Sequence, residues 1–298
     1  MYSKIFALII IFSLLIVIPS GNAQLSLANK ADQKSIQITI NSINDIKVKH
    51  IVRSSSVPVS VDLMEGTISE LNVMDENKNE VEFGIIGENQ QVIIFPTKNN
   101  SIVRYNLENI FLQKDGMNSI NIKYEQLVSI ITPKDVNLVF VNEIAILLDG
   151  EKGINCHGCD ITLHYFENDE RILQKIYWED EEFYIEIYTD SEINDFNFSQ
   201  QSKSVNFNIE DKNKFIAILL PLELLWDPYQ IFLDDKKIKF QKTPISETHV
   251  LLNMKPETSG TVSIIGTTVI PEFPIIAPLA IGFLMILIIP FMKKINLH

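Results

Sequence analysis

The chain has 298 residues with 25 Lys and Arg against 38 Asp and Glu, a formal net charge of −13. This length is enough for two domains of ordinary size, and the acidic balance argues against nucleic acid as a partner. The two cysteines are too few for a disulfide scaffold.

Residues 1–23 have the layout of a secretory signal peptide. Lys4 precedes residues 5–18, which carry no charge, and Gly21 and Ala23 place small side chains at positions −3 and −1 of a cleavage site. As a helix, this apolar stretch would be about 21 Å long, too short to span a bilayer comfortably. We therefore expect export and removal of residues 1–23; an uncleaved N-terminal anchor is the alternative.

Residues 24–167 carry the period-two pattern of half-buried strands. Apolar side chains alternate with polar ones at residues 36–40 and 46–52, and turn-forming residues lie between, so the two runs predict an opening hairpin. His50 falls in the apolar row of the second run, which predicts an inward-facing histidine. Residues 124–131 show no clear pattern. Further strand-like runs, separated by polar turn clusters, lie at residues 57–63, 81–84, 92–95, 102–105, 120–124, 136–141, 144–148 and 161–166.

Residues 168–268 carry a second set of short strands. The charged segment 168–171 suits a domain boundary. Residues 222–226 suggest one short helical turn, and Asp234-Asp235 is better explained by a hairpin turn than by a metal site. The strand-like runs lie at residues 183–187, 205–209, 215–220, 231–240, 250–252 and 262–265. Repeated short strands predict an all-β chain with two Ig-like β-sandwich domains, residues 24–167 and 168–268.

Residues 269–298 have the pattern of a membrane anchor with a basic tail. Residues 273–292 carry no charge and would form a transmembrane helix about 30 Å long, the thickness of a bilayer's hydrocarbon core. Lys293 and Lys294 follow as a membrane stop, and their charge favours a cytoplasmic C-terminus with the large N-terminal part outside the cell. A buried core helix is the alternative, against which the apolar character of every face argues.

The C-terminal part of the chain also carries a resemblance. The matching stretches are residues 218–229, 233–235, 248–250 and 264–274. They resemble the C-terminal module of archaeal, thaumarchaeal-type secreted surface proteins, a family of unknown function. Pro271-Glu272-Phe273, followed by a transmembrane helix and a basic tail, resembles the PEF-CTERM sorting signal that archaeosortases process. Pro274 stands where that signal has glycine, so we expect a permanent anchor. The resemblance covers roughly residues 172–294 and implies a surface location without an activity.

The loop Cys156-His157-Gly158-Cys159 has the composition of a reactive site. A haem attachment motif is excluded, because Asp160 stands where that motif needs histidine. A metal site would use both thiolates with His157, since an extended strand would place the next histidine about 16 Å from the loop. A local disulfide is the third interpretation, either an inert clip or a redox-active pair, and the inert disulfide is favoured.

Two further features have both a functional and a non-functional explanation. The acidic run 179–182 has calcium-site composition, but consecutive strand residues point to alternate faces, so a solvated charge run is expected. Asn99 and Asn197 begin Asn-x-Ser tripeptides and are glycosylation candidates in an exported chain, Asn99 being preferred for its polar turn. The sequence holds no hydrolase, metalloprotease or phosphate-loop motif, so we predict no enzyme and no cofactor.

The predicted function is that of a single-pass cell-surface protein with a structural, adhesive or ligand-binding role in the envelope. Its predicted partners are the lipid bilayer, through residues 273–292, and surface-layer proteins, other extracellular proteins or glycans. The alternative is a redox-active or metal-handling (copper or zinc) surface protein that uses Cys156 and Cys159, and a catalytic ectodomain is a third class.

Overall fold

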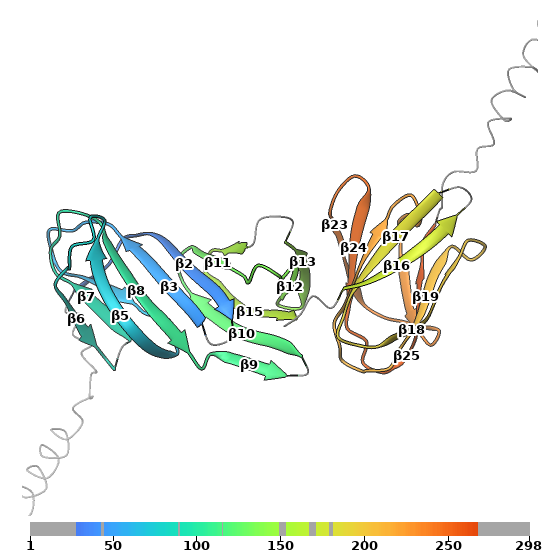
Figure 1. The fold of residues 1–298 in the computed structure, drawn as a ribbon, viewed down its shortest axis with the longest axis horizontal. Helices are drawn as coiled ribbons and strands as arrows, with labels where there is room; N and C mark the ends of the chain where they lie inside the picture. The colour runs from blue at the N-terminus through green and yellow to red at the C-terminus, as the bar shows by residue number, and fades with distance from the viewer. Residues whose placement is uncertain are drawn as a thin grey trace, which may run out of the picture. The chain divides into compact units, whose positions relative to one another are not determined.

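The computed structural model describes residues 28–42, 45–88, 90–114, 116–148, 153–166, 171–178 and 181–267. These residues form strands β1 to β25, arranged in five sheets (Figure 1), and the predicted all-β class is confirmed. Within these ranges, no helical segment has the length and apolar character of a membrane span. The predicted signal peptide, residues 1–23, and the predicted anchor, residues 269–298, lie outside the described part of the chain.

The chain forms two compact units whose segments alternate along the sequence. The first comprises the described residues up to Lys34 together with Ile51–Leu63 and Asn72–Val103. The second comprises Ser35–His50, Met64–Leu71 and the described residues from Arg104 onward. The domain boundary predicted between residues 167 and 168 stays a prediction.

The first unit contains a four-stranded sheet with the order β1-β4-β7-β6. Its strands are β1 (Asn29–Lys30), β4 (Val59–Asp62), β7 (Gln91–Ile94) and β6 (Phe83–Ile86). Strand β1 is parallel to β4, and β4 pairs antiparallel with β7, with Val61 opposite Val92. Both valines are fully buried, so the alternation of these strands directs one row of side chains into a core.

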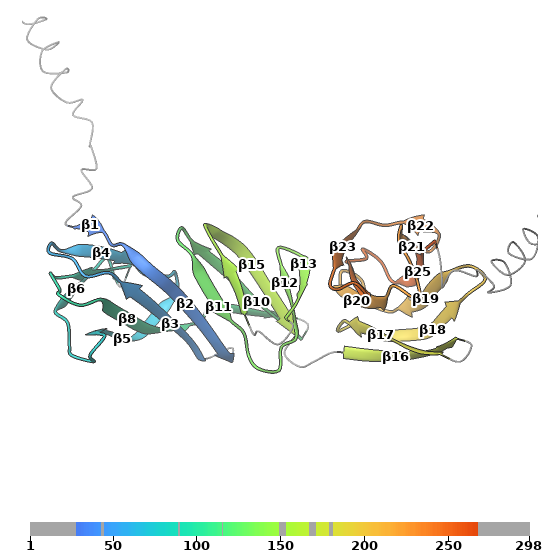
Figure 2. The ribbon, with the colours of Figure 1, turned by 90° about the horizontal axis from the view of Figure 1, so that it is seen from above.

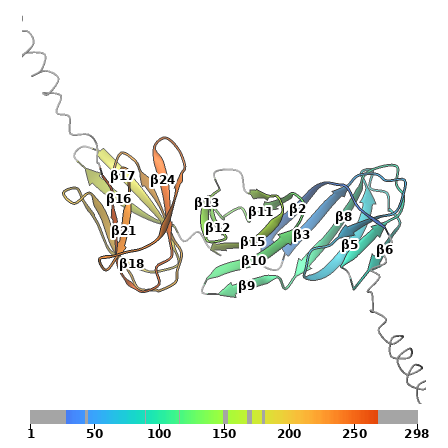
Figure 3. The same cartoon turned by 180° about the vertical axis from the view of Figure 1, so that it is seen from behind.

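A six-stranded sheet has the order β14-β11-β2-β3-β8-β5. Figure 3 shows β11, β2, β3, β8 and β5 of this sheet. Its strands are β14 (Gly153–Cys156), β11 (Val128–Ile131), β2 (Gln33–Ser42), β3 (Asp45–Val52), β8 (Ser101–Glu108) and β5 (Thr67–Asp75). The neighbouring positions of β2 and β3 confirm the predicted opening hairpin. Strand β11, from the stretch without a clear pattern, pairs parallel with β2 and sets Val128 opposite Ile36.

The second unit also holds a five-stranded sheet with the order β13-β12-β15-β10-β9. Its strands are β13 (Ile144–Leu147), β12 (Leu138–Val141), β15 (Cys159–Phe166), β10 (Met117–Tyr124) and β9 (Phe111–Lys114). Strands β10 and β15 pair antiparallel over their whole length, from Met117 opposite Phe166 to Tyr124 opposite Cys159. This pairing fixes the start of β15, where the cysteine loop ends.

The C-terminal module consists of two five-stranded sheets (Figure 2). One has the order β16 (Arg171–Trp178), β17 (Glu181–Tyr188), β20 (Ile216–Pro221), β24 (His249–Met254) and β23 (Phe240–Pro244). The other has the order β18 (Ile193–Ser199), β19 (Ser204–Ile209), β25 (Gly260–Ile265), β21 (Gln230–Leu233) and β22 (Lys236–Lys237). The two sheets share one hydrophobic core, to which Ile185 and Ile218 contribute from the first and Phe207 and Val262 from the second. This shared core is consistent with a β-sandwich.

Two local predictions in this module are confirmed. Asp234 and Asp235 have φ angles of 46° and 65° and connect β21 to β22 as a hairpin turn, a conformation that aspartate tolerates. The N–H of Leu225 donates to the carbonyl of Pro221 at 3.2 Å. This bond closes the single helical turn expected at residues 222–226.

Candidate functional site

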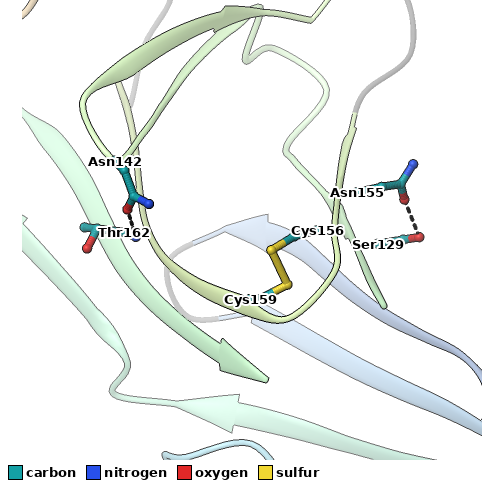
Figure 4. The surroundings of a disulfide bond; sticks show 6 residues. All are labelled: Ser129, Asn142, Asn155, Cys156, Cys159 and Thr162. Carbon is teal, nitrogen blue, oxygen red and sulfur yellow. Dashed lines mark hydrogen bonds between the residues drawn. A yellow bond between two sulfur atoms is a disulfide. The ribbon is translucent and has the colours of Figure 1, made fainter. Parts of the chain in front are cut away.

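The predicted reactive loop lies where the chain passes from one sheet to another (Figure 4). Cys156 ends β14 in the six-stranded sheet, and Cys159 begins β15 in the neighbouring five-stranded sheet. The two cysteines form a disulfide, with their Cα atoms 5.4 Å apart, within the usual range for such a bond. The disulfide therefore closes the corner between the two sheets.

Strand pairing on both sides brings the two cysteines together. Cys156 lies opposite Val128 of β11, and Cys159 lies opposite Tyr124 of β10. Only two residues separate the cysteines, and the second of them, Gly158, has a φ of 61°, which glycine adopts without steric cost. The chain can therefore reverse within the loop while both flanking strands keep their backbone hydrogen bonds.

Side-chain hydrogen bonds support the strands on either side of the loop. The hydroxyl of Ser129 donates to the side-chain oxygen of Asn155 at 2.6 Å. Thr162 donates its N–H to the side-chain oxygen of Asn142 at 2.9 Å and its hydroxyl to that of Asn121 at 2.8 Å. These bonds connect β11 to β14, and β15 both to β10 and to the turn that follows β12, so they hold the corner in place together with the disulfide.

The two cysteines of the loop differ in burial. Cys159 is 2 % exposed, whereas Cys156 is half-buried and His157 is exposed. Across the residues that the structure describes, no group of three His, Cys, Asp or Glu side chains is arranged to hold a metal ion. The predicted set of Cys156, His157 and Cys159 is thus not brought together as metal ligands, because the sulfurs bond to each other.

The second histidine of this region, His164, has a different environment. It lies on β15, half-buried, with its ring 5.5 Å from the ring of Phe215. Burial lowers the pKa of His164, and the positive charge of Lys255 lowers it further, while Glu143 acts in the opposite direction. His164 is therefore held in its neutral form against an aromatic contact and is separate from the cysteine loop.

A cavity of about 340 Å³ lies beside β10 and β15. Its apolar lining comes from several strands and loops: Ile38, Met64, Leu107, Ile110, Ile120, Ile122 and Ile161. Polar side chains also border it, among them Glu65 and the ion pair of Lys123 with Asp160, whose atoms are 3.5 Å apart. Small-molecule sites are commonly 300 Å³ or larger, with an apolar lining and a few polar groups. Sequence reasoning missed this cavity because its lining is spread over residues 38–162.

His50 forms a buried hydrogen-bond network, as its position in the apolar row predicts. Its side chain is fully buried, and Nε2 lies 3.0 Å from the hydroxyl of Tyr105. The N–H of Met64 donates to the same hydroxyl at 3.0 Å. Burial raises the pKa of Tyr105, so this hydroxyl keeps its proton and can donate it to His50 while accepting from Met64.

The two glycosylation candidates both lie on the surface. Asn99 is exposed, and its side-chain nitrogen donates to Asp75 at 3.2 Å. Ser101 of the same tripeptide is fully buried. Asn197 is exposed on strand β18, next to a register shift that begins after Asn194. Glycan attachment at either asparagine stays a prediction.

The remaining charged candidates are explained by local contacts. Of the acidic run, the described Glu182 pairs with Lys175 at 2.6 Å, and this contact lowers the pKa of Glu182. Glu181 is exposed. His249 lies 2.9 Å from the hydroxyl of Thr248, a partner that the sequence did not suggest.

Comparisons with known proteins leave the family open. No protein-family model matches the chain, and no curated protein matches it. Among solved structures, an aminopeptidase N family protein from Idiomarina loihiensis aligns with 50% of this chain and 31% of its own, at 8% identity and a TM-score of 0.35. The aligned region spans less than a third of that protein, and so distant a likeness carries no argument about activity.

Proposed function

We propose that the chain is an exported, single-pass surface protein whose β-sandwich domains serve a structural, adhesive or ligand-binding role outside the membrane. The observation that carries this proposal is the disulfide between Cys156 and Cys159 at the corner between two sheets. Stable structural disulfides are typical of oxidising compartments outside the cytoplasm. Export agrees with the signal-peptide pattern of residues 1–23 and with the anchor pattern of residues 273–292.

The proposed topology states where each part of the chain lies relative to the membrane. The bilayer holds residues 273–292, and Lys293 and Lys294 remain on the cytoplasmic side. The described strands then lie outside the cell, where the acidic composition favours solubility. The cavity beside β10 and β15 is the candidate site for a small extracellular ligand.

Protease accessibility tests the topology. The full chain carries an epitope tag after His298, and protease is added to intact cells and, as a control, to permeabilised cells. We expect intact cells to retain only a short tagged fragment that begins near residue 268, and permeabilised cells to lose the tag. A protected fragment that contains the strands would refute the topology.

A second candidate function is thiol–disulfide exchange at the same loop. Cys156 is half-buried while Cys159 is buried, and a difference of this kind would direct a partner thiolate to one sulfur. Exchange with a partner dithiol would transfer two electrons and two protons to Cys156 and Cys159 and leave the partner as a disulfide.

A redox titration distinguishes the two candidates. The full chain in detergent is equilibrated with glutathione buffers, and its thiols are alkylated and counted by mass spectrometry. A structural disulfide should have a midpoint below about −300 mV, whereas a midpoint above about −250 mV supports exchange. The double variant Cys156→Ser/Cys159→Ser is the control, because the chain has only these two cysteines and the variant should show no alkylation at any potential.

A further inference from the structure

Strand β16 forms an edge of its sheet and has β17 as its neighbour on one side (Figure 2). The two strands pair from Arg171 opposite Tyr188 to Trp178 opposite Glu181, and two residues separate the last pair. In a hairpin of this length, the last pair is hydrogen-bonded, and bonded pairs then alternate with non-bonded pairs. Leu173, Lys175 and Tyr177 therefore direct their backbone N–H and C=O groups away from β17, towards the open edge.

The other edges of this module have features that hinder pairing. Strand β22 has two residues, β18 has a register shift between Asn194 and Asn197, and β23 ends in Pro244. Strand β16 has eight residues, without a proline and without a shift in its register with β17. Long, regular edge strands of this kind readily pair with another strand.

The outward side chains of β16 are also suited to a contact. Leu173 and Tyr177 are 55% and 70% exposed, high values for large apolar residues. The two cations of the strand are paired with glutamates of β17, Arg171 at 3.7 Å from Glu186 and Lys175 at 2.6 Å from Glu182. The edge therefore offers apolar surface and backbone groups with little uncompensated charge.

We propose that β16 pairs with β16 of a second copy of this chain, antiparallel and about a two-fold axis at Gln174. In this register, Leu173 lies opposite Lys175 of the second copy, and Arg171 lies opposite Tyr177, where a cation can contact the ring face. Residues with outward backbone groups then face each other and form the intermolecular hydrogen bonds.

Charge and side-chain direction select this register. An axis at Lys175 would place two lysines directly opposite each other, which destabilises a strand pair. A shift by one residue would set core-facing side chains opposite solvent-facing ones. The symmetric arrangement is the commonest for protein assemblies. This contact between copies goes beyond the proposed function and does not depend on membrane anchoring.

Disulfide trapping in the full chain tests the register. Gln174 occupies a non-bonded position on the axis, where the Cα atoms of the two copies would be about 4.5 Å apart. That spacing suits a disulfide, so Gln174→Cys should give a covalent dimer on non-reducing gels of intact cells that express the full chain. The matched control is Tyr177→Cys. Position 177 is more exposed than position 174, but the Cα atoms of residue 177 in the two copies would be about 20 Å apart.

A backbone variant tests the pairing itself. Adding Leu173→Pro to Gln174→Cys removes one outward N–H from each copy, while pairing with β17 is kept. We expect the dimer yield to fall about tenfold, whereas Leu173→Thr, which keeps the N–H, should preserve it. Hydrogen exchange of β24 shows whether each variant is folded.

Three outcomes would overturn the proposal. They are a Gln174→Cys chain that stays monomeric, a Tyr177→Cys chain that crosslinks equally fast, and a Gln174→Cys chain that forms a disulfide with a different protein and no homodimer. The protease test of topology is unaffected by any of them.

Discussion

Removing the hydroxyl of Tyr105 should destabilise strands β3 and β8 selectively. Tyr105 is 2 % exposed, and its hydroxyl is 3.0 Å both from Nε2 of His50 and from the N–H of Met64. Tyr105→Phe deprives two buried polar groups of this partner, and each such loss costs about 1–3 kcal/mol. Part of this cost is offset, because the variant no longer buries a hydroxyl. We therefore expect the opening free energy of β3 and β8 to fall by about 3 kcal/mol.

Hydrogen exchange measured by mass spectrometry resolves this effect within the full chain. Peptides that cover β3 and β8 report the opening free energy of these strands, and a loss of about 3 kcal/mol corresponds to exchange about 150-fold faster. Tyr177→Phe is the matched control, because Tyr177 is 70% exposed and its change should cost less than about 0.5 kcal/mol. Equal exchange in Tyr105→Phe and the unaltered chain, or faster exchange confined to β16–β25, would refute the reasoning.

Three further results are expected. Phe207→Ala should lower the free energy of unfolding by about 3–5 kcal/mol, because Phe207 is fully buried in the C-terminal core. Denaturant unfolding followed by tryptophan fluorescence measures this change, and a decrease below about 1 kcal/mol would contradict the packing. Because the pKa of His164 is lowered in the folded chain, the unfolded chain binds more protons, so thermal stability should fall as pH drops below about 6.5. His164→Gln should weaken this dependence, and an unchanged slope would exclude His164 as its source. Replacing Cys156 and Cys159 together by serine should lower the free energy of unfolding, measured by calorimetry, by about 1–2 kcal/mol, because the disulfide closes a short loop. A decrease above about 4 kcal/mol would show that the disulfide stabilises the corner by more than loop closure alone.

The sequence predicts strands best where one face is buried and the other is solvated. Strands β2 and β3 follow the alternation at residues 36–40 and 46–52. Strand β16 was missed, because Ile172 and Ile176 face the core while Leu173 and Tyr177 face outward, and apolar side chains on both faces remove the period-two signal. At β18 the sequence suggests a strand only around Asn197, because the register shift breaks the alternation along the rest of the strand.

The chemistry of the candidate site was easier to predict than its location. Two cysteines three positions apart make a local disulfide the simplest pairing, and the structure contains it. Its position between two sheets depends on which strands neighbour β14 and β15. Those neighbours, β11 for β14 and both β10 and β12 for β15, are chosen by long-range packing, which local sequence patterns do not encode.

The parallel pairing of β2 with β11 has a consequence for the order of folding during synthesis. Val128 must be available before Ile36 can meet its partner, and 92 residues separate these two positions in the chain. At ordinary rates of translation, this delay is about 5–18 s. During that time the edge of β2 that later pairs with β11 has no partner strand, so the sheet stays incomplete and the chain would remain unfolded enough for the proposed export. Under the proposed export, the six-stranded sheet would be completed on the far side of the membrane, where an oxidising environment would close the Cys156–Cys159 corner once β14 and β15 are in place.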